Sequence, residues 1–239
     1  MRLPDAQPSR NHAGREAMAV LAYFAVYMTY QFRYAESDIA HWITLVLLPF
    51  VLLHALRRLS GPTSFPADTL RAVGLRRRNL RSGLIWAIPL GLVLSALPML
   101  FSERRQEVWR IIESGKVLYL FPLATVLLLL TAGFTEEFFF RGILQTRLAR
   151  WIKSNVWAVV VTAVLFGLYH VPYAYLKPQW PSYGNLEAAF RIALFEGGVG
   201  GLILGAVYVK ARGNLLACIV MHALIDVFPA MTMVKFGQS

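Results

Sequence analysis

Long apolar runs dominate this sequence, and the segments between them carry most of the Lys and Arg residues. Seven such runs cover residues 17–32, 39–56, 82–101, 117–148, 156–170, 188–209 and 215–234. A helix needs about 20 predominantly apolar residues to cross the hydrocarbon core of a bilayer. A chain that is 57% hydrophobic and 15% charged is too apolar for a disordered protein or an ordinary soluble domain. The sequence therefore predicts an all-α, polytopic transmembrane helical bundle with about seven spans, or eight helices if one re-entrant segment is present.

The distribution of positive charge predicts how the chain is oriented in the cell membrane. Lys and Arg are enriched in the cytoplasmic segments of multi-pass proteins. The N-terminal segment and every second connection after it hold 15 of these residues, whereas the opposite set of segments holds 8. We therefore expect a cytoplasmic N-terminus and a first run that is a retained anchor, and the side of the C-terminus is left open. The net charge of +11 comes without a nucleic-acid recognition motif, so the lipid bilayer and not nucleic acid is the expected partner.

Three regions follow from this pattern: a polar cytoplasmic N-terminus at 1–16, N-terminal transmembrane helices at 17–116 and a C-terminal transmembrane core at 117–239. Within the second region, residues 70–81 alternate Leu, Val and Gly with five arginines. This segment either lies in the interface with its arginines among anionic headgroups or is a solvated loop that sets the topology. In the core, a stripe of glycines at every fourth position predicts close packing of another helix: Gly197, Gly201 and Gly205.

Acidic and imidazole side chains within the apolar runs are the strongest functional signal. They are costly at bilayer depth and mark a functional site or a structural pair. They stand in four of the runs: Glu136 with Glu137, His170, Glu196, and His222 with Asp226. At about 1.5 Å per residue from the cytoplasmic end, the acids and histidines of the fourth, fifth and seventh runs lie at comparable depths, about 12 to 22 Å. These three runs therefore predict one shared pocket, whereas Glu196 is expected to pair with Arg191 near the interface or with a group in the pocket.

The first of these clusters is TEEFFFRG at 135–142. Glu137 and Arg141 are four residues apart, so on a helix they share a face and neutralise each other. Glu136 points about 100° away and has no such local partner, which makes it the candidate general base. In the alternative interpretation, both glutamates form one buried salt-bridge cluster with Arg141 that holds helices together.

The second and third clusters each carry a histidine. Phe166 and His170 are four residues apart, so the phenyl ring can form a wall beside the imidazole, although a lone histidine at a helix end is also often an interfacial polar tip. His222 and Asp226 share a face, and an aspartate there can fix the imidazole tautomer or hold the imidazolium form. In the alternative interpretation, His222 and Asp226 are a structural pair that bond only to each other.

Three motifs thus occur in order in the C-terminal half: EExxxR from Glu136 to Arg141, FxxxH from Phe166 to His170, and Hxxx(N/D) from His222 to Asp226. The combination resembles the CPBP family of intramembrane proteases, which includes Rce1-like CAAX prenyl endopeptidases and bacteriocin-processing or abortive-infection-type relatives. The resemblance implies that 117–239 is a catalytic helical core that hydrolyses a peptide bond in a membrane-associated or lipid-modified substrate. This chain has an aspartate where the family often has an asparagine.

The residues themselves indicate how such hydrolysis works. Cleavage of an amide needs an activated water and a donor for the oxyanion of the tetrahedral transition state. We expect Glu136 to take the proton of the water while His170 positions that water. Glu137 and Arg141 are expected to organise the cluster. The sequence therefore predicts a glutamic-type intramembrane endopeptidase without a cofactor.

The last motif, Hxxx(N/D), is expected to stabilise the oxyanion. His222 is expected to donate a hydrogen bond to the oxyanion. An ionised aspartate cannot donate, so Asp226 is either protonated or acts only through His222. Phe140 and Phe166 are expected to line the substrate pocket.

Other functions stay open. A zinc-dependent protease is one, because His170, His222 and Glu136 can supply three ligands and leave a fourth position for water. Against zinc, the chain has no HExxH motif and only one cysteine, Cys218. A proton-coupled transporter also places such groups in the membrane, although the halves show no inverted repeat, and a non-catalytic immunity or scaffold protein can have the same fold. Nothing in the sequence selects among a prenylated CAAX peptide, a bacteriocin leader, a sorting-signal tail and a generic transmembrane segment as substrate.

Overall fold

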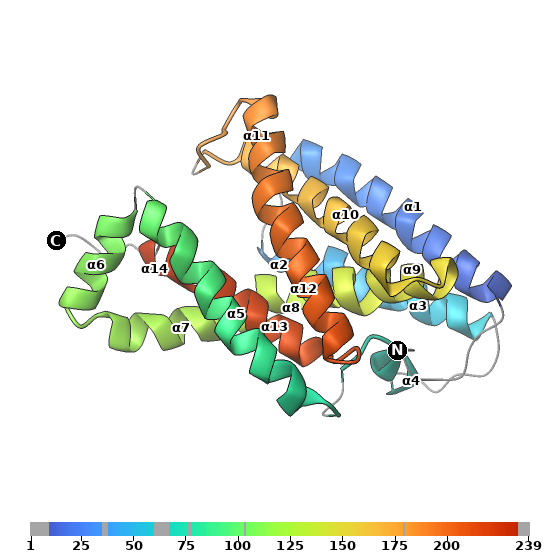
Figure 1. The fold of residues 1–239 in the computed structure, drawn as a ribbon. Helices are drawn as coiled ribbons and strands as arrows, with labels where there is room; N and C mark the ends of the chain where they lie inside the picture. Colours follow the sequence, from blue (N-terminus) through green and yellow to red (C-terminus); the bar gives the residue numbers. More distant parts are fainter. Residues whose placement is uncertain are drawn as a thin grey trace.

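The computed structural model describes residues 10–34, 38–59, 67–75, 78–102, 104–178 and 180–233. Within these ranges all regular structure is helical, which confirms the predicted all-α bundle (Figure 1). The elements in chain order are α1 (Arg10–Tyr34), α2 (Asp38–His41), the π-helical η1 (Trp42–Leu47), α3 (Leu48–Arg58), α4 (Ala67–Ala72), α5 (Leu80–Phe101), α6 (Arg105–Glu113), α7 (Val117–Leu130), α8 (Ala132–Glu137), the π-helical η2 (Phe138–Gln145), α9 (Thr146–Ile152), α10 (Asn155–Leu176), α11 (Leu186–Ile192), the π-helical η3 (Ala193–Gly198), α12 (Val199–Lys210), α13 (Leu215–Ile225) and α14 (Val227–Met233).

Four helical stretches of the described residues are long and apolar enough to cross a membrane: Leu80–Phe101, Val117–Ile152, Asn155–Leu176 and Leu186–Lys210. They coincide with four of the predicted runs, which supports an integral membrane protein. The total of seven spans and the side on which the N-terminus lies stay predictions. Helix α1 begins at Arg10, inside the segment expected to be a polar tail, and residues 1–9 lie outside the described ranges.

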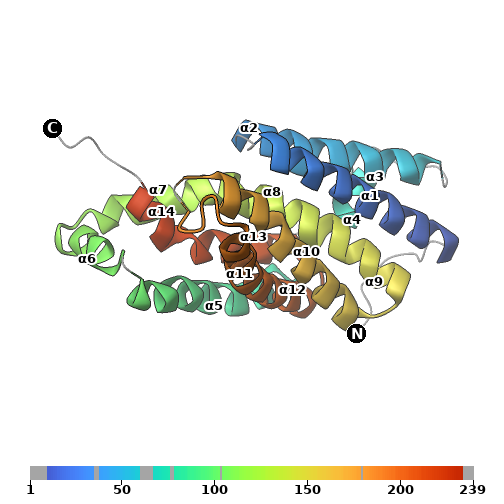
Figure 2. The same cartoon turned by 90° about the horizontal axis from the view of Figure 1, so that it is seen from above.

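Helix α13 occupies the centre of the bundle. It packs against α5, α8 and α12, while α1 runs along α9 and α10 (Figure 1). Seen from above, α1 to α3 lie on one side of the central helices and α5 lies on the other (Figure 2). Small residues permit this packing: a Cβ atom on Gly83 of α5 would lie 2.6 Å from the Cβ of Ala217 in α13. The charged groups of α8, α10 and α13 are therefore brought into one interior.

The predicted glycine stripe lies where α12 crosses α10. A Cβ atom on Gly201 would lie 3.1 Å from the Cα of Ala163, and one on Gly205 would lie 3.0 Å from a methyl group of Val159. Only a residue without a side chain permits this approach. The prediction of close helix packing is confirmed.

The seventh apolar run forms two helices and not one. Helix α13 ends at Ile225, Asp226 follows with φ −90° and ψ −3°, and α14 starts at Val227. Pro229 has no backbone N–H to continue the hydrogen-bond ladder back to Ile225, although a proline is tolerated in the first turn of a new helix. One continuous helix over 215–234 is therefore wrong, and Asp226 lies at a helix end instead of mid-helix.

Part of the arginine-rich segment at 70–81 is packed inside the protein. Val73 is fully buried, and the carbonyl of Gly74 accepts a 3.1 Å hydrogen bond from the backbone N–H of Leu215 at the start of α13. Neither expected environment, headgroups or solvent, describes these two residues. Arg71 and Arg78 remain exposed, and residues 76 and 77 lie outside the described ranges.

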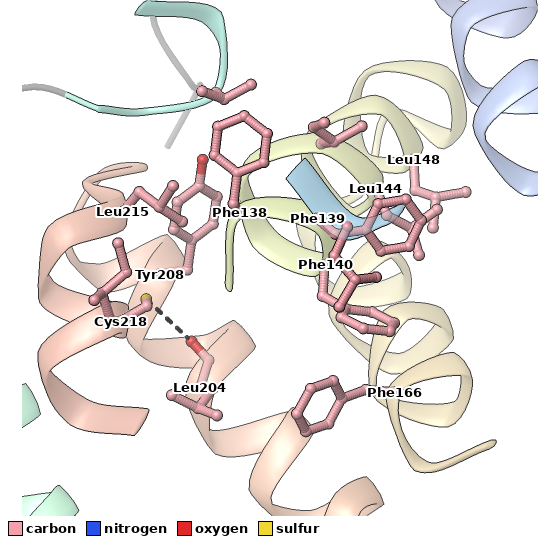
Figure 3. Close-up of a cluster of buried hydrophobic side chains, with 14 of the residues drawn as sticks. Phe138, Phe139, Phe140, Leu144, Leu148, Phe166, Leu204, Tyr208, Leu215 and Cys218 are labelled. Atoms are coloured by element: carbon pink, nitrogen blue, oxygen red, sulfur yellow. Dashed lines mark hydrogen bonds between the residues drawn. The ribbon is translucent and has the colours of Figure 1, made fainter. Parts of the chain in front are cut away.

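The hydrophobic core is built around the three consecutive phenylalanines of η2. Phe138, Phe139 and Phe140 are all at most 1% exposed. Figure 3 shows Phe138 on the side of Tyr208, whereas Phe140 points toward Phe166, whose ring centroid lies 4.9 Å away. A segment that is apolar on all sides is stable only in the interior. The core therefore encloses the segment that directly follows the two glutamates.

Candidate active site

The two glutamates lie at the end of α8, where the chain changes from an α-helix to the π-helical η2. Gly133 brings α8 against α13, since a Cβ atom on it would lie 3.1 Å from the carbonyl oxygen of Ile219. Glu136 and Glu137 are 7% and 0% exposed. Short π-helical segments are often found at functional sites. The local fold therefore holds two carboxylates in the protein interior, beside the central helix.

Glu137 is bound by two positively charged or protonated partners through one oxygen. Its Oε1 accepts a 2.9 Å hydrogen bond from Arg141 Nη1 and lies 2.7 Å from His222 Nδ1. Arg141 also donates to the carbonyl of Gly201 at 3.3 Å, and its guanidinium lies 4.3 Å from the ring centroid of Phe166. The predicted pair of Glu137 and Arg141 is thus present, and it is extended across the bundle to α13.

Glu136 presents its two oxygens to different surroundings. Oε1 accepts a 3.4 Å hydrogen bond from the hydroxyl of Tyr169. Oε2 lies 3.8 Å from Nε2 of His170 and 3.8 Å from Nε2 of His222, and this buried oxygen has no hydrogen-bond partner. Both separations are longer than a direct hydrogen bond. Glu136 Oε2 therefore faces two imidazole nitrogens without bonding to either of them.

His170 is oriented by its own helix. Nδ1 lies 2.8 Å from the carbonyl oxygen of Phe166, which can only accept, so Nδ1 carries the hydrogen and Nε2 of the neutral ring presents its lone pair to Glu136. The rings of Phe166 and His170 meet edge to face with centroids 4.7 Å apart. Gly197 of η3 covers the imidazole from the other side, because a Cβ atom there would lie 3.0 Å from Nδ1.

Asp226 forms the outer boundary of the cluster. Its Oδ2 lies 3.3 Å from Nε2 of His222, and its side chain is 39% exposed, compared with 6% for His222. The imidazole of His222 therefore lies between the carboxylates of Glu137 and Asp226. The side chain of His170 is 21% exposed, so the site is most open beside His170 and Asp226.

The structure thus brings together all six polar residues expected at the site: Glu136, Glu137, Arg141, His170, His222 and Asp226. Phe166 touches this cluster directly. Phe140 is fully buried behind Phe166 and contacts Phe24, which favours packing over contact with a substrate. The side chain of Glu196 lies outside what the structure describes, and Arg191 lies 3.9 Å from Glu187.

Tyr169 was not expected at the site. Tyrosine is common in apolar helices, so its presence beside His170 does not by itself indicate a functional residue. The only available signal was its spacing, three residues after Phe166 and four before Tyr173, which places all three on related faces of α10.

Among the residues that the structure describes, no group of three or more His, Cys, Asp or Glu side chains is arranged to hold a metal ion. His170 Nδ1 and His222 Nδ1 each meet a protein acceptor, so the Nε2 atoms are the ring nitrogens that face Glu136. A carboxylate oxygen beside two imidazole nitrogens is an arrangement that can transfer protons.

Comparison with known proteins supports the resemblance found in the motifs. Residues 118–228 match the family of Rce1-like type II CAAX prenyl endopeptidases. No curated protein and no solved structure matches the chain. The matched residues include the three motifs and the whole polar cluster. The family match over residues 118–228 therefore agrees with the family that the three motifs resemble.

Proposed function

We propose that this chain is an intramembrane endopeptidase in which Glu136 activates the water that attacks a peptide bond. One observation carries the proposal: the buried, unpartnered Oε2 of Glu136 lies 3.8 Å from the Nε2 atoms of both His170 and His222. A buried carboxylate oxygen without a partner is costly unless a water or a substrate satisfies it. The family match over residues 118–228 supports proteolysis.

The first step is addition of water to the carbonyl carbon. Glu136 Oε2 takes one proton of the water, and the lone pair of His170 Nε2 accepts a hydrogen bond from the other. The new C–O bond forms as the carbonyl π electrons move to oxygen. In the second step the C–N bond breaks and Glu136 returns the proton to the leaving nitrogen, so atoms and charge balance over the cycle.

His222 stabilises the oxyanion of the tetrahedral intermediate. Each of its nitrogens faces a carboxylate, Glu137 at Nδ1 and Asp226 at Nε2, so both can carry hydrogens in the imidazolium form. Nε2–H then donates to the oxyanion in place of Asp226, while Glu137 and Arg141 hold the ring through Nδ1. In this arrangement Asp226 acts through His222 and does not contact the oxyanion.

The proposed substrate is a membrane-associated or lipid-modified peptide. Glu136 and His170 lie in two of the helical stretches that are apolar and long enough to cross a membrane, so the peptide bond must reach the site from within or beside the bilayer. The family name supports a prenylated CAAX peptide as the first candidate. We further propose a location in the cell membrane with a cytoplasmic N-terminus, on the basis of the charge distribution.

The test uses the full chain, purified and reconstituted in lipid nanodiscs. The probes are a prenylated CAAX peptide, the same peptide without the prenyl group, a leader peptide and a transmembrane peptide. We expect cleavage of the prenylated peptide, and a loss of about 10²- to 10⁴-fold in Glu136→Gln, because the general base is removed. Glu113→Gln changes an exposed glutamate of α6 and is expected to retain full activity.

Two results contradict the proposal. One is wild-type turnover by a folded Glu136→Gln variant. The other is binding of the peptides by the wild-type chain without cleavage of any of them, which favours the scaffold alternative. A chelator series separates the zinc alternative: we expect 1,10-phenanthroline and EDTA to leave turnover unchanged, whereas loss that zinc restores would assign catalysis to a metal.

A further inference from the structure

We infer that Tyr169 is a positioning residue for Glu136, and that Tyr27 and Tyr173, which are hydrogen-bonded to the N-terminal helices, hold its ring in place. The inference rests on the proposed role of Glu136 as general base. It connects residues of α1 and α2 with the candidate active site. These two helices lie outside the family match at 118–228. Neither the motifs nor the family match includes these residues.

The ring of Tyr169 is fixed on several sides. It is 1% exposed, and its centroid lies 5.2 Å from that of Phe140, 6.1 Å from that of Tyr27 and 4.9 Å from that of His170. A ring packed in this way cannot swing. The direction of its hydroxyl, which meets Glu136 Oε1 at 3.4 Å, is therefore set by packing and not by chance.

Hydrogen bonds from the N-terminal helices hold the two tyrosines that contact this ring. The rings of Tyr169 and Tyr173 meet edge to face, with centroids 5.6 Å apart. The hydroxyl of Tyr173 accepts a 2.8 Å hydrogen bond from Gln31 Nε2 of α1 and also contacts His41 Nε2 at the end of α2. Gln31 in addition donates to the hydroxyl of Tyr27, whose ring stacks on that of Tyr169.

Chemistry fixes the donors of these bonds. An ionised carboxylate can only accept, so the single hydrogen of the Tyr169 hydroxyl is donated to Glu136 Oε1. Gln31 Nε2 can only donate, so the hydroxyls of Tyr27 and Tyr173 accept from it. Both tyrosines whose rings contact Tyr169 are therefore tied to the end of α1.

The hydroxyl of Tyr169 also fixes the plane of the Glu136 carboxylate. Oε1 is held by Tyr169, so the other oxygen, Oε2, faces His170 and His222. Without Tyr169 the carboxylate can turn about its terminal bond, so that neither oxygen is held toward the two imidazoles. A general base must lie within hydrogen-bond reach of the proton it takes, so this rotation slows the chemical step and not substrate binding.

The experiment measures kcat and KM of the full chain in nanodiscs with the prenylated CAAX peptide. Tyr169→Phe keeps the packed ring and removes only the hydroxyl. We expect kcat to fall about 10- to 100-fold with KM within about twofold, as for loss of a hydrogen bond to a charged group. Tyr175→Phe is the matched control on the same helix, where the ring packs against a separate cluster with Ala174 and Ala189, and it is expected to keep the wild-type kcat.

A double-mutant cycle tests the support that Tyr173 gives. Tyr173→Phe is expected to lower kcat less than Tyr169→Phe, and the double variant is expected to match Tyr169→Phe alone, because Tyr173 acts only through Tyr169. Additive losses, an equal rise in KM, or a wild-type kcat in a folded Tyr169→Phe variant each overturn the inference. The proposed function is judged separately: an inactive Glu136→Gln with an unchanged Tyr169→Phe rejects the positioning role only, whereas an active Glu136→Gln rejects the general base.

Discussion

Two buried arginines lie six residues apart in the same long helical stretch, and they differ in what surrounds them. Arg141 and Arg147 are both fully buried, and each pairs with a glutamate, Glu137 at 2.9 Å and Glu16 at 3.4 Å. The first pair also contacts His222 and lies beside Glu136. Arg147 instead donates to backbone carbonyls, at 2.9 Å to Gly142 and at 3.3 Å to Ala72, and so ties α9 to α1 and α4.

The comparison teaches that a buried charge alone does not identify a site. Both pairs bear the cost of removing two charges from water. Of the two pairs, that of Glu137 is the one on which a further carboxylate and imidazoles converge from other helices. Arg147 is a structural link inside the protein.

The largest expected difference comes from removing each arginine in turn. We expect Arg141→Met and Arg147→Met each to cost about 3 to 5 kcal/mol of stability, because each leaves a buried carboxylate without its partner. Only Arg141→Met is expected to lower kcat of the folded fraction, by about 10- to 100-fold, since Glu137 then no longer holds His222 firmly. Thermal unfolding and single-turnover rates at a temperature where both variants are folded measure the two effects.

A second substitution sharpens this contrast. Adding Glu16→Gln to Arg147→Met removes the uncompensated carboxylate and is expected to restore part of the stability. Adding Glu137→Gln to Arg141→Met is not expected to restore activity, because Glu137 also binds His222. Equal activity losses in the two arginine variants would mean that the pairs have the same role.

A smaller effect is expected at Asp226, the most exposed member of the polar cluster. Asp226→Asn retains an oxygen that accepts a hydrogen bond from His222 but loses the charge, so we expect turnover to fall by no more than about tenfold. Asp226→Ala removes the acceptor and is expected to cost more. If Asp226→Asn abolishes cleavage while His222 stays in place, the ionised carboxylate is required and the proposed indirect role is wrong.

The smallest effect is expected from two adjacent glycines of α12. A Cβ atom on Gly201 would lie 3.1 Å from Phe166 Cδ1, whereas one on Gly200 meets nothing within 4 Å. Alanine in a helix interior gains about 0.5 to 1 kcal/mol over glycine, but overpacking costs about 1 to 3 kcal/mol. Gly200→Ala is therefore expected to raise the thermal midpoint slightly and Gly201→Ala to lower it. Equal shifts would show that Phe166 and Arg141 are not held by this crossing.

Local pairs within one helix could be predicted because they depend only on the 3.6-residue period. The pairing of Glu137 with Arg141 and the shared face of His222 and Asp226 follow from a spacing of four. The bond between Glu137 and His222 joins residues 85 positions apart and has no local signature. The contact of Tyr169 with Glu136 has no local signature for the same reason, because Glu136 lies on another helix.

The sequence by itself determined that the chain forms apolar helices, that a few ionisable groups lie within them, and which family motif these groups form. Hydropathy and helical spacing are properties of neighbouring residues, so they can be read without a fold. Only the tertiary structure decided which oxygen of Glu136 faces the histidines, that Arg147 is structural and that α1 and α2 contact the site. These features depend on the rotation and close approach of helices distant in the chain, which glycines and packed rings set together.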